Sequence, residues 1–99
     1  MWYVIMGKDA VNSLEKRLHA RSAHLQRLEK LRDEGRLLTA GPLPAIDSPE
    51  PGQAGFSGSL IVAEFEDIKE AEEWANADPY IQAGVYQDVV IHPYLRVLP

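Results

Sequence analysis

The chain has 99 residues, of which 45% are hydrophobic and 25% charged, with a formal net charge of −5 at pH 7 and no cysteine. This length and composition predict one globular domain over residues 1–99, with no room for a second. The lack of cysteine excludes disulfides, thiolate zinc sites and a cysteine nucleophile. The negative charge argues against general nucleic-acid binding, which needs a basic surface.

The first expected element is a strand over Trp2–Met6, ended by Gly7. The apolar run that contains it is too short for a membrane span or the core of a signal peptide. We therefore expect a cytoplasmic protein with no membrane partner.

A long helix follows, because apolar residues recur at helical spacing after Asn12 and stop at Gly35. Asn12 and Glu15 resemble a capping box at its start, and Gly35 is a favourable residue for its end. A second helix start at Ser22 is an alternative, with the helix broken near Arg21. The leucines expected to face the core are Leu14, Leu18, Leu25 and Leu28.

The rest of the chain predicts three strands and a second helix. A strand over 37–40 leads into a Pro- and Gly-rich loop, of which 43–57 is expected to border a site. A strand over 59–65, a helix over 67–76, a single turn starting at Asp78-Pro79 and a strand over 85–97 follow. The order predicts an α+β, ferredoxin-like βαββαβ fold, with an antiparallel sheet and both helices on one face. A second copy of the chain is the natural cover for the other face, in a homodimer or a higher oligomer.

His24 is the residue most suited to acid–base chemistry, since imidazole titrates near neutral pH. A helical wheel places it at the edge of the leucine stripe, together with Arg17 and Arg21. In that position a histidine is often only a core-edge residue, and a partner decides between the two interpretations. Asp78 is the best candidate, because an N-cap uses one carboxylate oxygen and leaves the other for the imidazole.

Other chemistry finds little support. Ser57 and Ser59 lack the surroundings of a nucleophilic serine. His19, His24 and His92 lack the spacing of metal ligands, and no glycine loop suited to phosphates is present. We expect no metal and no cofactor.

Several motifs, in this order and spacing, resemble the YciI family: the runs 21–25, 33–42, 55–59, 77–80 and 84–86. The resemblance implies a ferredoxin-like domain of the dimeric α/β-barrel type, related to muconolactone isomerases and to a dehydrochlorinase of chlorinated hydroxyquinol breakdown. It also implies that a histidine and an aspartate, here His24 and Asp78, form the catalytic pair. Ser22 departs from the proline common at its position, which leaves the helix start less rigid.

Two functions stay open. The first is a cofactor-free isomerase- or lyase-like enzyme that transfers a proton on, or eliminates a group from, a small cyclic anion. In it His24 is the base or acid, Asp78 orients it, and Arg21, Ser59 and Tyr80 bind the substrate. The second is a non-catalytic homodimer that binds a small ligand through the same residues.

Overall fold

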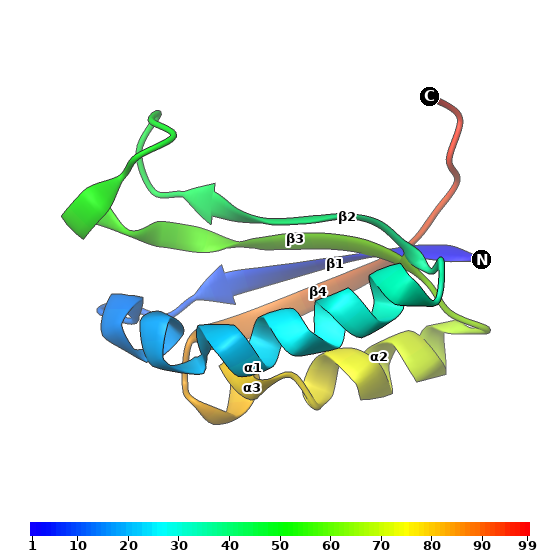
Figure 1. Ribbon diagram of the computed structural model, residues 1–99, viewed down its shortest axis with the longest axis horizontal. Coiled ribbons are helices and arrows are strands. Elements are labelled where there is room, and N and C mark those ends of the chain that lie inside the picture. Colours follow the sequence, from blue (N-terminus) through cyan, green and yellow to red (C-terminus); the bar gives the residue numbers. More distant parts are fainter.

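The computed structural model describes residues 1–99 and has the predicted α+β order, with a four-stranded sheet and helices on one side (Figure 1). The strands are β1 (Trp2–Asp9), β2 (Leu37–Pro44), β3 (Phe56–Glu64) and β4 (Tyr86–Tyr94). The helices are α1 (Leu14–Asp33), the short 3-10 helix η1 (Gly52–Ala54), α2 (Ile68–Asn76) and α3 (Pro79–Gln82). The ferredoxin-like prediction is confirmed.

The sheet has the strand order β2-β3-β1-β4, and every neighbouring pair is antiparallel. In its centre, Ile5 of β1 lies opposite Ile61 of β3 and Ile91 of β4. Because side chains alternate between the faces of a strand, Ile5 and Ile61 point toward the helices together. They form the core with Leu28 of α1 and Ala71 of α2, among other apolar residues.

Helix α1 is continuous over 20 residues, so the single long helix is confirmed and the alternative, a second start at Ser22 after a break near Arg21, does not hold. The predicted capping box is wrong as well, because Asn12 has a φ of 58° and the N-cap is Ser13, whose side chain makes no capping bond. The end is as expected. Gly35 adopts a φ of 73°, and its N–H donates to the carbonyl of Arg32, which glycine does at helix ends without steric cost.

The face that α1 buries differs from the leucine stripe. Leu28 is buried and Leu25 half-buried, but Leu18 is 61% exposed, so its predicted place in the core is wrong. Arg17 and His24 are buried instead. They precede Leu28 by eleven and four residues, which brings all three to one side of a helix with 3.6 residues per turn. The helix therefore presents a polar patch to the sheet beside its apolar one.

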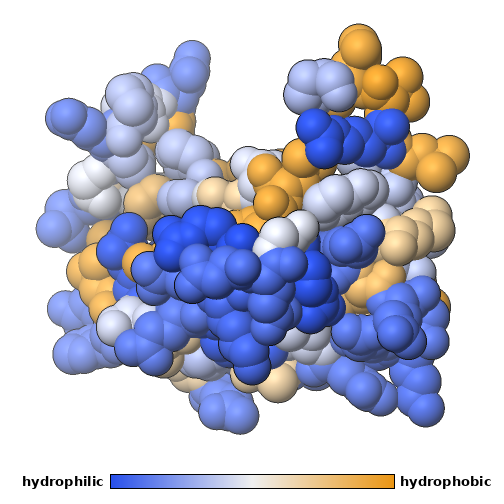
Figure 2. Space-filling model, turned by 45° about the vertical axis from the view of Figure 1, so that its right-hand side comes forward, coloured by the Kyte–Doolittle hydropathy of each residue, from blue (hydrophilic) through white to orange (hydrophobic).

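The sheet face opposite the helices carries no cover in this chain (Figure 1). Met6 and Val90 on that face are 45% and 41% exposed, and with Leu43 and His92 they line a shallow hollow. The segment after β4 leaves on this side with Leu95, Val97 and Leu98 exposed. Figure 2 shows apolar residues gathered at the top right of the view, above a mostly hydrophilic surface. No helix of the structure has the length and apolarity to cross a bilayer.

Candidate active site

His24 and Asp78 lie in direct contact between α1 and α3. The Nδ1 atom of His24 is 2.9 Å from both carboxylate oxygens of Asp78. The side chains are only 7% and 3% exposed. The imidazole also stacks on the ring of Tyr80, with 3.9 Å between centroids and 9° between planes. The ring of His24 is thus held by its edge and by one face.

The local sequence of α3 explains the place of Asp78. Asp78 is the N-cap and Pro79 takes the first helical position, as predicted. The Oδ1 atom accepts a hydrogen bond from the N–H of Tyr80 at 2.9 Å. One carboxylate therefore caps the helix and binds the imidazole.

This arrangement assigns different roles to the two ring nitrogens of His24. An ionised carboxylate only accepts hydrogen bonds, so Nδ1 carries the hydrogen and donates it to Asp78. The Nε2 atom makes no hydrogen bond within the chain and is not sealed from solvent. Its lone pair is free to take a proton from a bound molecule.

A cavity of about 200 Å³ adjoins His24. Three residues predicted to bind substrate, Arg21, Ser59 and Tyr80, all line it, whereas Asp78 does not. Leu25, Leu28 and Ile61 form apolar walls, and β2 contributes Ala40, Gly41 and Pro42. The loop segment 43–57 was expected to border this site, but it does not line the cavity.

Arg17, which the helical wheel placed beside His24 but to which the sequence assigned no role, lines the same cavity. Its Nε and Nη2 atoms donate to the two oxygens of Asp9 at 2.9 and 3.0 Å. Nη2 also donates to the Gly58 carbonyl at 3.0 Å and to Ser59 Oγ at 2.8 Å. The guanidinium carbon lies 4.9 Å from the ring centroid of Tyr80. The sequence held one signal, because Arg17 precedes His24 by two helical turns.

The charge of Arg17 is secured by its surroundings. Burial acts to lower the pKa of Arg17, but the hydrogen bonds and charge of Asp9 raise it, and the net shift is upward. Nη1 has no hydrogen-bond partner in the chain and is not completely sealed from solvent, so it can still bind a ligand. With Arg21, which lines the same cavity, it makes the cavity attractive to an anion.

Two tyrosines, Tyr80 and Tyr86, pack against each other beside the ring of His24. Tyr86 of β4 meets the ring of Tyr80 edge-on, with 5.4 Å between centroids. Its hydroxyl is buried and makes no hydrogen bond. Burial raises the pKa of both phenols. Ser59 offsets part of this rise for Tyr86, and Arg17 offsets part of it for Tyr80. Both phenols are therefore neutral at physiological pH.

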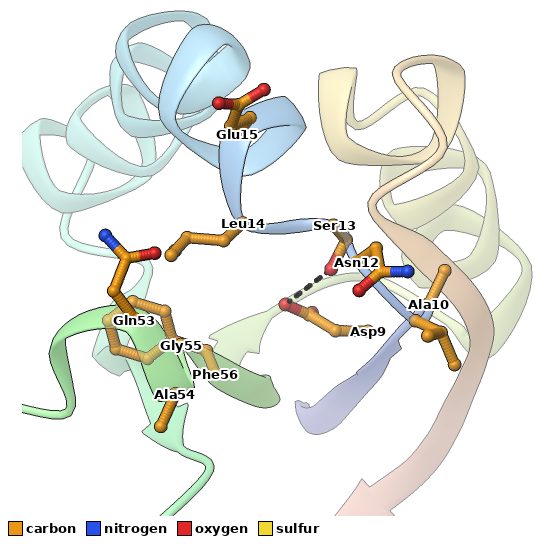
Figure 3. A pocket seen from close by; sticks show the side chains of 11 residues that line it. Asp9, Ala10, Asn12, Ser13, Leu14, Glu15, Gln53, Ala54, Gly55 and Phe56 are labelled. Atoms are coloured by element: carbon orange, nitrogen blue, oxygen red, sulfur yellow. Dashed lines mark hydrogen bonds between the residues drawn. The ribbon is translucent and has the colours of Figure 1, made fainter.

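A second, larger hollow of about 560 Å³ lies at the start of α1 (Figure 3). Gln53 and Phe56 border it on one side and Ser13 on the other, and Ser13 Oγ donates to Asp9 at 3.5 Å. The Asp9 carboxylate is engaged by Arg17, so no free acid–base pair faces this hollow. Nowhere do three or more His, Asp or Glu side chains gather as metal ligands would.

The chain is similar to several known proteins. A family model described as the YCII-related domain matches residues 1–94. Protein YciI of Escherichia coli O6:H1 (strain CFT073) is 59% identical over 97 residues, with 98% of this chain and 99% of that protein covered. An uncharacterized protein of Haemophilus influenzae is 54% identical over the same coverage.

A solved structure extends the comparison to an enzyme. It is the 5-chloro-2-hydroxyhydroquinone dehydrochlorinase TftG of Burkholderia phenoliruptrix AC1100 in complex with 2,5-dihydroxybenzoquinone. It superimposes with a TM-score of 0.84 at 25% identity, over 97% of this chain and 95% of the other.

Proposed function

The chain belongs to the YCII-related domain family, and from this premise we propose that it is a cofactor-free enzyme with His24 as its acid–base residue. The observation that supports this most is the buried contact of His24 Nδ1 with Asp78, which leaves Nε2 free beside a cavity. A base held by a carboxylate in this way is a common arrangement for proton transfer.

The reaction class we infer is proton transfer or elimination. Nε2 of His24 removes a proton from the substrate, and Asp78 stabilises the imidazolium that forms. In an isomerisation the proton returns to another atom of the same molecule. In an elimination the electron pair of the broken bond expels a leaving group as an anion, and His24 later releases its proton to solvent.

The substrate class we infer is a small, oxygenated, cyclic anion. Leu28 and Ile61 form apolar walls of the cavity, while Arg17 and Arg21 supply positive charge to it. Ser59 and Tyr80 complete the expected substrate contacts. The similar dehydrochlorinase holds 2,5-dihydroxybenzoquinone, a ring of this kind.

We infer a homodimer in which a second copy covers the helix-free sheet face. Met6 and Val90 are large apolar residues exposed there, and with Leu43 they line one hollow of that face. Sedimentation at micromolar concentration should give twice the mass of the chain, and Val90→Glu should shift it to the monomer. A wild-type monomer at that concentration would reject the dimer.

Turnover assays with variants test the enzymatic proposal. Candidate substrates are chlorinated hydroxyhydroquinones, with chloride release as the readout, and cyclic phenols, with deuterium uptake from solvent. We expect His24→Ala to remove turnover and Asp78→Asn to lower it by about 10²–10⁴-fold, because general acid–base catalysis contributes that much and His24 loses the partner that fixes its tautomer. His19→Ala, an exposed position on the same helix, is the control.

Two results would separate the alternatives. Unchanged turnover in folded His24→Ala would reject the proposal. The other result is binding without turnover. If 2,5-dihydroxybenzoquinone binds, if this binding requires His24 and Asp78, and if none of the candidate substrates is turned over, the non-catalytic ligand-binding homodimer becomes the better interpretation. The nitrogen chemical shifts of His24 give a further check, because Asp78→Asn should populate the tautomer with hydrogen on Nε2.

A further inference from the structure

Arg27 is a charged residue near the His24–Asp78 pair that the proposed chemistry does not use. It follows His24 by three residues on α1, so both side chains leave the same side of the helix. It does not line the cavity of His24 but borders a separate hollow with Leu31 and Trp74. Any influence on the reaction must therefore pass through another residue.

The guanidinium of Arg27 is held in place by Trp74 of α2. Its Nη2 atom donates to the Trp74 carbonyl at 2.8 Å, and its central carbon lies 4.3 Å from the ring centroid. The contact joins α1 to α2 and fixes the direction of the second nitrogen, Nη1.

Nη1 is buried and makes no hydrogen bond, although it lies 4.0 Å from Oδ2 of Asp78. Buried donors usually have partners, so this one calls for an explanation. Oδ1 of Asp78 accepts from Tyr80 and His24, but Oδ2 accepts only from His24. Burial lowers the pKa of Arg27 and Asp78 opposes that shift, so the two charges act on each other.

We propose that Arg27 is a positioning residue that acts on His24 through Asp78. Its fixed charge, 4.0 Å from Oδ2, offsets part of the negative potential of the carboxylate, so Asp78 holds an imidazolium less tightly. The charge also repels an imidazolium directly. Both effects have the same sign and help His24 to release a proton that it has taken up; the catalytic part of this statement rests on the proposed function.

Other charged or titratable groups face the pair as well. Helix α1 contributes Arg17 and Arg21, α3 contributes Tyr80, and β4 contributes Tyr86. The residues of β2 and β3 that line the cavity carry no charge. All of these groups stay in place when Arg27 is replaced, so the difference between variants isolates its effect.

The experiment is an NMR titration of His24 in Arg27→Met, Arg27→Lys and the wild type, with the resonance assigned from His24→Ala. We expect the pH midpoint of the titration to rise by about one unit in Arg27→Met, because an opposite or like charge at this range shifts titrations by that order. Arg27→Lys should stay near the wild type. The control is Arg32→Met, an exposed arginine of the same helix whose ion pairs are with Glu29 and Asp33.

An unchanged midpoint in folded Arg27→Met overturns the proposal. So does an equal shift in Arg27→Lys, because the charge would then not be the cause. If Arg27→Met does not fold, Arg27→Gln removes the charge and keeps a polar group for the Trp74 carbonyl.

The titration needs no substrate, so it separates this proposal from the enzymatic one. A shifted midpoint in a protein without turnover would support the effect of Arg27 on His24 and contradict the enzymatic proposal. Turnover that depends on His24, with an unshifted midpoint, would keep the enzyme and reject the role of Arg27.

Discussion

The buried ion pair of Arg17 and Asp9 offers a quantitative test of what holds the cavity wall together. Arg17→Met removes the four hydrogen bonds that the guanidinium donates and leaves the Asp9 carboxylate, 3% exposed, without its cation. Only Ser13 Oγ remains near it, at 3.5 Å. Removing one partner of a buried pair costs about 3–5 kcal/mol. That is a large share of the roughly 5–15 kcal/mol that stabilises a domain of this size.

The reverse change should cost less. In Asp9→Asn the amide oxygen still accepts from Arg17, and the guanidinium keeps the Gly58 carbonyl and Ser59 Oγ. We expect a loss of about 1.5–3 kcal/mol, the value of a hydrogen bond to a charged group. In the double variant no charge is left unpaired, so its cost should fall below the sum of the single costs by about 0.5–3 kcal/mol.

Urea denaturation, followed by circular dichroism, measures the free energy of unfolding of the wild type, the two single variants and the double variant. The control Arg32→Met breaks exposed ion pairs and should change stability by less than about 1 kcal/mol. Additive single costs, or a loss below about 1 kcal/mol in Arg17→Met, would show that the pair is not coupled as the geometry implies.

Two other substitutions give independent checks. Tyr86→Phe removes a buried hydroxyl without a partner, so at pH 8 it should leave the free energy of unfolding unchanged or raise it by about 1 kcal/mol. Burial raises the pKa of Tyr86 and of Tyr80 in the folded state. The contribution of the two neutral phenols to folding stability is therefore complete below about pH 10, where phenols of the unfolded chain ionise, and is lost as the pH rises further. Between pH 8 and pH 10.5 the free energy of unfolding, measured with urea, should therefore fall more in the wild type than in Tyr86→Phe. An equal fall in both proteins would contradict the burial argument. Gly58→Ala would drive its Cβ into the carbonyl oxygen of Gly7 and should cost about 3 kcal/mol or more. Gly41→Ala meets nothing within 4 Å, and a similar loss in both variants would refute the clash.

The parts of the fold that the sequence predicted carry local signals. Gly35 marks the end of α1 because the conformation it needs depends on that residue alone. Asp78 followed by Pro79 marks the start of α3, since both preferences belong to adjacent positions. The order of strands and helices follows from such signals, and it is enough to select the fold.

The strand bounds were less well predicted. Strand β2 was expected to stop before Gly41-Pro42 but continues to Pro44. Proline lacks the N–H that a central strand needs, but β2 lies at the edge of the sheet, where one side stays unpaired. The position of a strand in a sheet is a property of the whole fold, so the local pattern could not show it.

The burial of Arg17 could not be predicted for a similar reason. Its partners Asp9, Gly58 and Ser59 lie 8, 41 and 42 residues away along the chain. A helical wheel treats arginine as polar and leucine as apolar, which turned Leu18 inward and Arg17 only to the edge. The actual orientation follows from hydrogen bonds across the fold, which offset the cost of burying a charge.

The contact of His24 with Asp78 depends on the same kind of distant packing, because the two residues are 54 positions apart. Helix α3 has only four residues, too few to be stable without tertiary contacts. Tyr80 supplies those contacts, since it is buried between the imidazole and the ring of Tyr86 and packs with Val85. The N-cap role of Asp78 then ties the carboxylate to this small cluster rather than to the main core. The geometry of the pair is therefore set by the rings of Tyr80 and Tyr86. Substitutions in these rings should displace the His24 side chain while the sheet stays folded.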